Sequence, residues 1–234
     1  MPDVSYRRVG HKGADHIAPG NTLASFDAAL AAGVDMVEFD VLRIGDGRLV
    51  LAHDLADAQR PDVLTLDEGL DHLVTDAYAG IELDVDLKRP GYEREVVDAL
   101  RARRLLDRTL ISTMEETSLP VIRALDPSVR LGLSVPKMRR NPLSHPVTKP
   151  LALMGAHWYR RRLAKRVVAG LRAGEFDAVM AHYAVVDGRL VTAIKEAGGE
   201  LYVWTVDEAP RIARLEALGV TGIISNDPRL FVSA

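Results

Sequence analysis

Two histidines, His11 and His53, bracket a pair of carboxylates, Glu38 and Asp40, in the first quarter of the sequence. The carboxylates are two residues apart within an apolar run, 34–41, that is typical of a buried strand. Residues i and i+2 of a strand point to the same side, so both carboxylates would share one face. Neighbouring carboxylates repel unless a cation lies between them or one takes a proton. The pair therefore predicts a site for a hard divalent cation.

A second segment, 81–88, alternates apolar and charged residues over its whole length. As a strand of a closed barrel it would point four charged side chains inward: Glu82, Asp84, Asp86 and Lys88. Charges that face a closed interior are costly unless they are paired or bound to a metal. The alternative is an edge strand whose charged face lies in solvent.

Short apolar stretches alternate with amphipathic helical stretches along the chain. We expect strands at 6–10, 36–41, 81–87, 109–112, 130–133, 178–181, 201–205 and 222–224. The expected helices are 22–32, 93–104, 119–125, 159–172, 190–197 and 209–218, the first of them capped by Asn21 or Thr22. This alternation with short connections predicts a parallel sheet.

Eight strands fit a TIM (β/α)8 barrel, whereas fewer would fit an open doubly wound sheet. The sequence has no glycine-rich phosphate loop or dinucleotide fingerprint before a helix, which favours the barrel. The length fits a single domain over residues 1–234. Barrel active sites lie at the carboxyl ends of the strands, where His11, Glu38, Asp40, Asp86 and Lys88 are expected.

Composition narrows the protein class. The chain is 47% hydrophobic with a formal net charge of −3, as in soluble globular proteins. It contains no cysteine, which excludes disulfide and thiolate chemistry. Residues 1–10 show no apolar signal segment, so we expect a cytoplasmic location.

Charge is distributed unevenly. Residues 127–174 contain eleven Lys or Arg and no Asp or Glu, which leaves 19 basic and 33 acidic residues elsewhere. Closely spaced prolines followed by a basic helical pattern predict an inserted segment at about 136–172, between the fifth and sixth strands. Trp158 and Tyr159 beside three arginines would suit peripheral membrane contact, and a rim helix with solvated arginines is the alternative. No groove-reading motif accompanies the basic block, so nucleic acid is not an expected partner.

Taken in order, these motifs resemble the glycerophosphodiester phosphodiesterase family. That family's pattern runs His-Arg-Gly, Pro-Glu-Asn-Thr, Glu-x-Asp-Val, Asp-Gly and His-Asp. The matching segments here are His11-Lys12-Gly13, Pro19-Gly20-Asn21-Thr22, Glu38-Phe39-Asp40-Val41, Asp46-Gly47 and His53-Asp54. Later matches are Asp86-Leu87-Lys88 against Glu-Ile-Lys, Val203-Trp204-Thr205-Val206, and the segment 222–228. The likeness covers nearly the whole chain.

The resemblance implies a metal centre and a pair of proton carriers. Glu38, Asp40 and Asp86 would bind a divalent cation, and ligation by oxygen alone suits Mg²⁺ or Ca²⁺. His11 and His53 would act as general acid and base on a phosphodiester, in an order left open. Histidine suits this role because its unperturbed pKa is about 6.5.

The resemblance also implies a set of substrate and phosphate contacts: Lys12, Lys88 and Trp204. Three positions depart from the family pattern. Lys12 replaces an arginine and offers a point charge instead of a fork of donors. Gly20 replaces a glutamate. Asp86 replaces a glutamate that is one methylene longer, and Asp84 or Glu82 could compensate.

The activity implied is metal-dependent hydrolysis of glycerophosphodiesters to glycerol 3-phosphate and an alcohol, as part of glycerol and lipid metabolism. One alternative is a lysophospholipase D type enzyme that acts on lysophospholipids at a membrane. Another is a diverged, non-catalytic phosphate binder, which the three departures favour and the two histidines oppose. An aldolase or isomerase would share the carboxylates but would leave the His-Lys-Gly start unexplained. The leaving group and the oligomeric state are not predicted.

Overall fold

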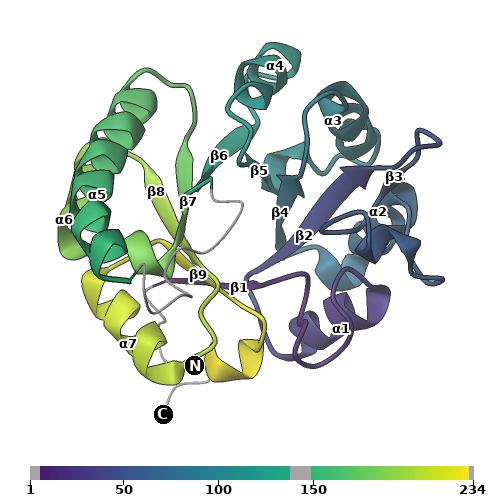
Figure 1. Cartoon of the computed structure of the whole chain (residues 1–234). Helices are drawn as coiled ribbons and strands as arrows, with labels where there is room; N and C mark the ends of the chain where they lie inside the picture. Colours follow the sequence, from purple (N-terminus) through teal and green to yellow (C-terminus); the bar gives the residue numbers. More distant parts are fainter. Residues whose placement is uncertain (1–5, 138–148, 232–234) are drawn as a thin grey trace.

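The computed structural model describes the backbone of residues 6–137 and 149–231, and the side chains of those residues outside 149–160. Eight parallel strands form a barrel that helices surround (Figure 1). The barrel strands are β1 (Arg7–Gly10), β2 (Met36–Arg43), β4 (Glu82–Leu87), β5 (Thr109–Thr113), β6 (Arg130–Val135), β7 (Ala178–His182), β8 (Glu200–Trp204) and β9 (Gly222–Ser225). Because β1 pairs with both β9 and β2, the barrel is closed. The predicted TIM barrel is confirmed, and each predicted strand overlaps an observed one.

The helices lie outside the barrel (Figure 1). They are α1 (Leu23–Ala31), α2 (Leu66–Leu73), α3 (Glu93–Ala102), α4 (Ser118–Leu125), α5 (Lys149–Arg172), α6 (Gly188–Glu196) and α7 (Ala209–Leu218). Single 3-10 turns form η1 (Asp57–Gln59), η2 (Asp76–Tyr78), η3 (Leu106–Arg108), η5 (Tyr183–Val185) and η6 (Pro228–Phe231). None of the helices within the described ranges has the length and hydropathy needed to cross a membrane.

Besides the 3-10 turns, one helix and one strand of the described residues lie outside the predicted set. One is α2, although Thr65 and Glu68 form the capping box that marks its start. The other is the short strand β3 (Leu49–Val50), which is antiparallel to β2. At α1 the cap is Thr22, whose hydroxyl accepts from the Ser25 amide. The alternative cap, Asn21, has a different partner in the site.

The predicted basic insertion falls largely outside the described residues. Residues 138–148 are not described, and neither are the side chains of 149–160, which include Trp158 and Tyr159. The helix α5 begins at Lys149 rather than at residue 159 and leads into β7, the position of a barrel crossover helix. An inserted segment at 136–172 and its contact with a membrane therefore stay predictions.

Strand β2 shows why the inward carboxylates are fixed in place. Its alternate residues Val37, Phe39 and Val41 are fully buried in the core between the barrel and the helices. Phe39 packs against Phe26 of α1, with ring centroids 5.8 Å apart. Burying three such side chains stabilises the fold by several kcal/mol in total, at about 1.5–3 kcal/mol each. A one-residue slip in the register of β2 would turn the carboxylates toward the surrounding helices. The packing of the apolar side chains against those helices therefore fixes the inward orientation of the carboxylates.

The amino-terminal end of the barrel is closed by an ionic cluster. Arg7, Glu82, Arg130 and Glu200 come from alternate strands β1, β4, β6 and β8. Arg7 Nε lies 3.1 Å from Glu82 Oε1, and Arg130 Nη1 lies 3.6 Å from Glu200 Oε2. Because Glu82 is held by two arginines at this end, it cannot complete a cation site at the opposite end. That part of the sequence expectation is wrong.

A guanidinium–carboxylate clamp fastens the start of β2 to β1. Arg8 donates from Nε to Asp35 Oδ2 at 2.9 Å and from Nη2 to Asp35 Oδ1 at 2.6 Å. The Arg8 amide donates to the same Oδ2 at 2.8 Å. Burial alone would raise the pKa of Asp35, but these hydrogen bonds from Arg8 bring it below its ordinary value. The carboxylate therefore stays charged across the neutral range.

We expect Asp35→Ala to lower the free energy of unfolding by about 1–2 kcal/mol at pH 7, a range discounted because the pair is partly exposed. A depressed folded pKa contributes stability above the unfolded value, near 3.9, that is lost as pH falls through the folded pKa. The difference between variant and wild type should therefore shrink below about pH 4. Urea denaturation at pH 7 and pH 3 measures it, with the exposed Asp98→Ala as the control. An equal loss at both pH values would contradict this account.

Candidate active site

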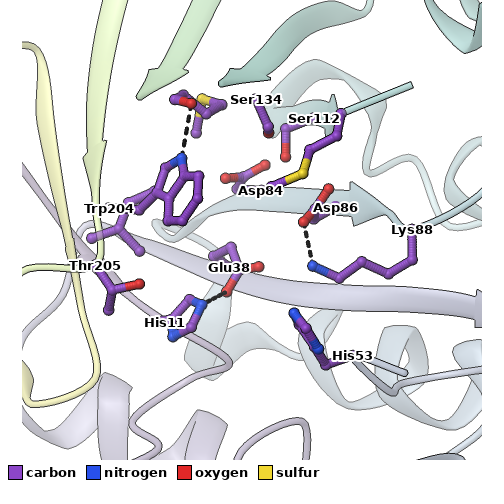
Figure 2. Close-up of a pocket in the computed structure, with 13 residues that line it drawn as sticks. His11, Glu38, His53, Asp84, Asp86, Lys88, Ser112, Ser134, Trp204 and Thr205 are labelled. Atoms are coloured by element: carbon purple, nitrogen blue, oxygen red, sulfur yellow. Dashed lines mark hydrogen bonds and ion pairs between the residues drawn. The ribbon is translucent and has the colours of Figure 1, made fainter. Parts of the chain in front are cut away.

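A pocket of about 150 Å³ opens at the carboxyl ends of the strands (Figure 2). It is lined by His11, Glu38, His53, Asp84, Asp86, Lys88, Ser112, Met114, Ser134, Met180, Trp204, Thr205 and Ile224. The pocket lies where barrel active sites are expected, and it collects most of the predicted site residues.

Three carboxylates cluster at the acidic side of the pocket, where Glu38 and Asp86 line it and the fully buried Asp40 does not. Glu38 and Asp40 share the inward face of β2, and Asp86 lies opposite Asp40 in the register of β2 and β4. Oxygen atoms of the three side chains all lie within 4.8 Å of one another. Glu38 is 4% exposed and Asp40 fully buried. The predicted cation ligands are thus brought together at a spacing that one divalent ion can bridge.

Lys88, directly after β4, supplies positive charge to this group. Its Nζ forms ion pairs with Asp40 and Asp86. Burial opposes a charged lysine, but the two carboxylates raise the pKa of Lys88 above its ordinary value. Burial would also raise the pKa of Asp40, yet Lys88 lowers it. The pKa of Glu38 is raised well above the ordinary value by burial and by the charge of Asp40.

The loop between β1 and α1 supplies hydrogen bonds to the carboxylates of β2. The Lys12 amide donates to Glu38 Oε2 at 2.7 Å. Asn21 donates from Nδ2 to Asp40 Oδ2 at 2.9 Å, and its Oδ1 accepts from the Asp40 amide at 3.1 Å. Lys12 and Asn21 reach these positions with positive φ values of 51° and 59°. The two residues of the Asn-Thr motif therefore have different roles. Asn21 binds the Asp40 carboxylate, while Thr22 caps α1.

The structure explains the glycine that replaces a family glutamate. A Cβ on Gly20 would lie 2.6 Å from Asp15 Oδ1 and 2.8 Å from Lys12 Cβ. The Gly20 amide donates to the same Asp15 oxygen at 2.8 Å. Any larger residue would therefore push this loop apart. The close packing of the loop between β1 and α1 therefore requires glycine at position 20.

His11 is oriented by residues from the other end of the chain. Its Nδ1 lies 2.6 Å from Asn226 Oδ1, and Asn226 Nδ2 donates to Asp207 Oδ2 at 2.7 Å. A carboxylate only accepts, so the Asn226 oxygen must face His11, and His11 Nδ1 must carry the proton. This leaves Nε2 as the unprotonated nitrogen of the neutral ring, 3.8 Å from Glu38 Oε2. Burial lowers the pKa of His11, which favours that neutral form.

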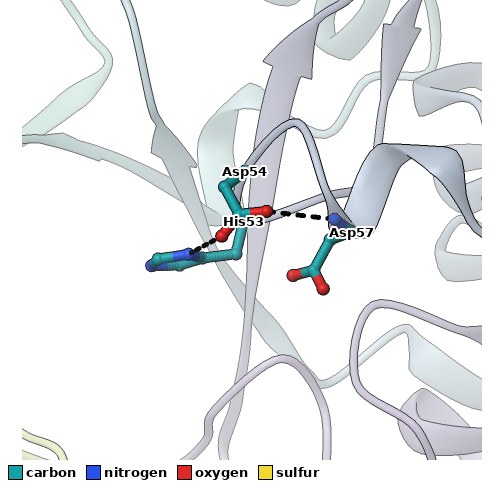
Figure 3. Close-up of side chains that lie close together, drawn as sticks. All are labelled: His53, Asp54 and Asp57. Atoms are coloured by element: carbon teal, nitrogen blue, oxygen red, sulfur yellow. Dashed lines mark hydrogen bonds and ion pairs between the residues drawn. The ribbon is translucent and has the colours of Figure 1, made fainter.

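His53 lies on the same side of the pocket as His11 (Figure 2), on the loop after β3, with half of its side chain exposed. Its Nδ1 is 3.6 Å from Asp54 Oδ2 (Figure 3). Asp54 Oδ1 accepts from the Asp57 amide at 3.0 Å and from the Ala56 amide at 2.8 Å, which fixes the turn into η1. The two histidines therefore differ, since His11 is rigidly held and His53 sits on an open rim.

Of the predicted substrate contacts outside the acidic cluster, Trp204 lines the pocket and Lys12 does not. Trp204 lines the pocket and donates from Nε1 to the Met180 carbonyl at 2.8 Å. The Lys12 ammonium lies 3.9 Å from Asp15 and is not among the pocket-lining groups, so its predicted phosphate contact is untested. His182, at the end of β7, stacks edge-on against Trp204 with ring centroids 5.0 Å apart.

A further acidic group lines the pocket, Asp84, which is 1% exposed. Burial raises the pKa of Asp84 to about 7, while a hydrogen bond from Ser112 acts in the opposite direction. Its Oδ1 has no hydrogen-bond partner among the described residues. Asp84 lies two residues before Asp86 on β4 and opposite Glu38 in the register of β2 and β4, so it adjoins the three predicted cation ligands.

Comparison with known proteins decides the family. A model described as the glycerophosphoryl diester phosphodiesterase family matches residues 11–76 and 55–230. The chain belongs to the glycerophosphoryl diester phosphodiesterase family. It is accordingly an enzyme, a phosphoric diester hydrolase of the glycerophosphodiester phosphodiesterase type. The matched region includes both predicted histidines and all three predicted cation ligands.

Individual relatives agree over almost the whole chain. A glycerophosphodiester phosphodiesterase from Caldanaerobacter subterraneus is 23% identical over 257 residues, which cover 96% of each chain. A crystal structure described as a putative glycerophosphoryl diester phosphodiesterase from Silicibacter pomeroyi has a TM-score of 0.74 at 20% identity, covering 98% of this chain and 92% of that one. A phosphodiesterase from Oleispira antarctica, solved with the product sn-glycerol-3-phosphate, has a TM-score of 0.72 at 23% identity and covers 95% and 94%. These solved structures share the barrel fold.

We expect Asn226→Ala to release the His11 ring from its fixed tautomer. Loss of orientation at a proton-transfer group costs on the order of 100-fold, so kcat should fall while KM changes little. Nitrogen-15 NMR of the His11 imidazole, together with steady-state kinetics, measures both effects. The exposed Thr75→Ala serves as control. An unchanged Nδ1–H signal in the variant would show that Asn226 does not set the tautomer.

Proposed function

We propose that this enzyme hydrolyses glycerophosphodiesters to glycerol 3-phosphate and an alcohol, using a divalent cation held by Glu38, Asp40 and Asp86. His11 and His53 carry the protons. The observation that supports this most directly is the placement of two histidines on one side of a pocket (Figure 2), next to a cluster of three carboxylates of which Glu38 and Asp86 line the pocket. The presence of both histidines in the pocket argues for catalysis over simple phosphate binding.

The acidic group fits a cation in both chemistry and charge. Asp86 Oδ1 is buried and has no hydrogen-bond partner among the described residues, so one ligand position is free of competing donors. Three carboxylates and the Lys88 ammonium carry a net charge of about −2, which a divalent ion would neutralise. Oxygen-only ligation favours Mg²⁺ or Ca²⁺. When bound, the ion would neutralise charge that develops on the phosphoryl oxygens.

The chain's own residues would move the protons. A glycerol hydroxyl next to the phosphoryl group attacks phosphorus, and one histidine takes its proton while the other protonates the departing alcohol. Water then opens the cyclic phosphate with the roles exchanged, which gives glycerol 3-phosphate. His11 suits proton transfer through Nε2, because Asn226 holds the Nδ1 proton. Lys88 would bind a phosphate oxygen, and the Trp204 indole would pack on glycerol carbons.

This function would place the enzyme in glycerol and lipid metabolism, with a small-molecule glycerophosphodiester as its substrate. A cytoplasmic location and a peripheral membrane contact through the segment 136–172 stay predictions from the sequence. The lysophospholipid alternative rests on that same segment, whose side chains lie partly outside the described residues. The soluble diester is therefore the substrate class we favour.

The direct test is release of glycerol 3-phosphate from glycerophosphocholine, glycerophosphoethanolamine and a lysophospholipid, with Mg²⁺, Ca²⁺ or EDTA. We expect release that depends on the metal, and a loss of at least 100-fold in His11→Ala and in His53→Ala because general acid–base catalysis contributes about 10²–10⁴-fold. His16→Ala, a histidine that does not line the pocket, is the control. Full activity in EDTA, or in either pocket variant, would refute the proposed mechanism.

Cation binding can be measured without turnover. We expect Glu38→Gln and Asp86→Asn each to weaken Mg²⁺ or Ca²⁺ binding by at least tenfold in calorimetry, because each removes an anionic oxygen ligand. Asp98→Asn, an exposed carboxylate on α3, should leave the affinity unchanged. Equal affinity in all four proteins would place the ion elsewhere.

A further inference from the structure

The segment that carries His53 has few contacts with the rest of the molecule. It spans residues 53–62, between β3 and α2, and none of its residues is buried. Its hydrogen bonds are mostly internal, as where Asp54 accepts from the backbone amide of Asp57 (Figure 3). These bonds shape the turn, but they do not fix where the turn lies. A segment with so few buried contacts opens at little cost in free energy.

Arg60, the residue at the end of η1, connects this segment to another loop. Its Nη1 and Nη2 atoms both donate to the Gly20 carbonyl oxygen, at 3.2 Å each. Within the part of the chain that the structure describes, no other hydrogen bond joins residues 53–62 to a distant part of the sequence. Its Nε lies 3.9 Å from Asp62 Oδ1, so the guanidinium also contacts its own segment. The position of the turn therefore depends on the contact between Arg60 and Gly20.

The carbonyl that Arg60 binds is itself fixed in place. The Gly20 amide donates to Asp15 Oδ1 at 2.8 Å, and the space around Gly20 leaves no room for a Cβ. The next residue, Asn21, donates to Asp40 Oδ2 at 2.9 Å and accepts from the Asp40 amide. Arg60 thus attaches its own turn to the loop that binds a carboxylate of the proposed cation site.

We propose that Arg60 is a positioning residue, which sets the place of the His53 imidazole in the pocket by binding the Gly20 carbonyl. This proposal rests on the proposed phosphodiesterase function, in which His53 carries a proton. Arg60 does not line the pocket, so it acts through His53 and not on the substrate. A charged guanidinium makes stronger hydrogen bonds than a neutral donor, and its planar fork directs two nitrogens at one acceptor. Proton transfer needs such control, because it requires the imidazole within hydrogen-bond reach of the reacting oxygen.

Steady-state kinetics with glycerophosphocholine give the first test. We expect Arg60→Ala to lower kcat about 10- to 100-fold with little change in KM, because a small displacement of a proton carrier slows the chemical step. Arg60→Lys keeps the charge but has one donating nitrogen, so its kcat should be intermediate. The control is Arg48→Ala, which removes an exposed arginine that binds Asp46 in the turn before β3 and should keep the wild-type kcat. A wild-type kcat in Arg60→Ala would overturn the proposal.

A double variant separates positioning of His53 from a general structural role. If Arg60 acts through His53, its removal has no further effect once the imidazole is absent. We therefore expect the double variant His53→Ala/Arg60→Ala to have the same kcat as His53→Ala alone. A residue that only stabilises the fold would lower kcat by the same factor in both backgrounds. Losses that multiply in the double variant would therefore refute the positioning role.

The contact can also be tested without turnover. The chain has no cysteine, so spin labels attached through Ile17→Cys and Ala56→Cys, both at exposed positions, report the distance between the two loops alone. We expect a broader distance distribution when Arg60→Ala is added, and an unchanged one when Arg48→Ala is added. Equal widths in all three labelled proteins would refute the proposal. If the wild type hydrolyses no diester, the proposed function fails, and the distance distributions alone then decide whether Arg60 positions the turn.

Discussion

The crowding of carboxylates around Lys88 is the constraint on which the rest of this structure depends. Asp40 and Asp86 touch the same ammonium, and Glu38 lies close enough to repel Asp40. Such a group is stable in a barrel interior only if every carboxylate has donors or counter-charge. The backbone amide of Lys12 and the side chain of Asn21 supply those donors, which explains why a loop with two left-handed non-glycine residues is maintained next to β2.

The two histidines of the pocket are held in different ways because they lie in different surroundings. His11 is built into the barrel wall and takes its orientation from Asn226, which the Asp207 carboxylate holds in turn. His53 is attached to a surface turn that the Asp54 side chain fixes through backbone amides. One imidazole thus has a defined tautomer before any ligand arrives, while the other can adjust to what the pocket holds.

The sequence predicts the barrel and the acidic cluster well, because both are encoded by local alternation. Glu38 and Asp40 could be assigned to one face from the period of β2 alone, and the buried Val37, Phe39 and Val41 confirm it. The Asp207–Asn226–His11 chain could not be predicted in this way, since His11 and Asn226 are 215 residues apart in the sequence and meet only where β9 pairs with β1. The steric reason for Gly20 likewise depends on Asp15 across a turn, and no periodicity reveals it.

The ionic cluster of Arg7, Glu82, Arg130 and Glu200 limits how substrate and product reach the pocket. It fills the axis at the amino-terminal end, so the pocket communicates with solvent from the opposite side. Substrate must then enter and product must leave through the same opening of the pocket. If the product kept its phosphate at the proposed cation ligands, it would block the next turnover and act as a competitive inhibitor.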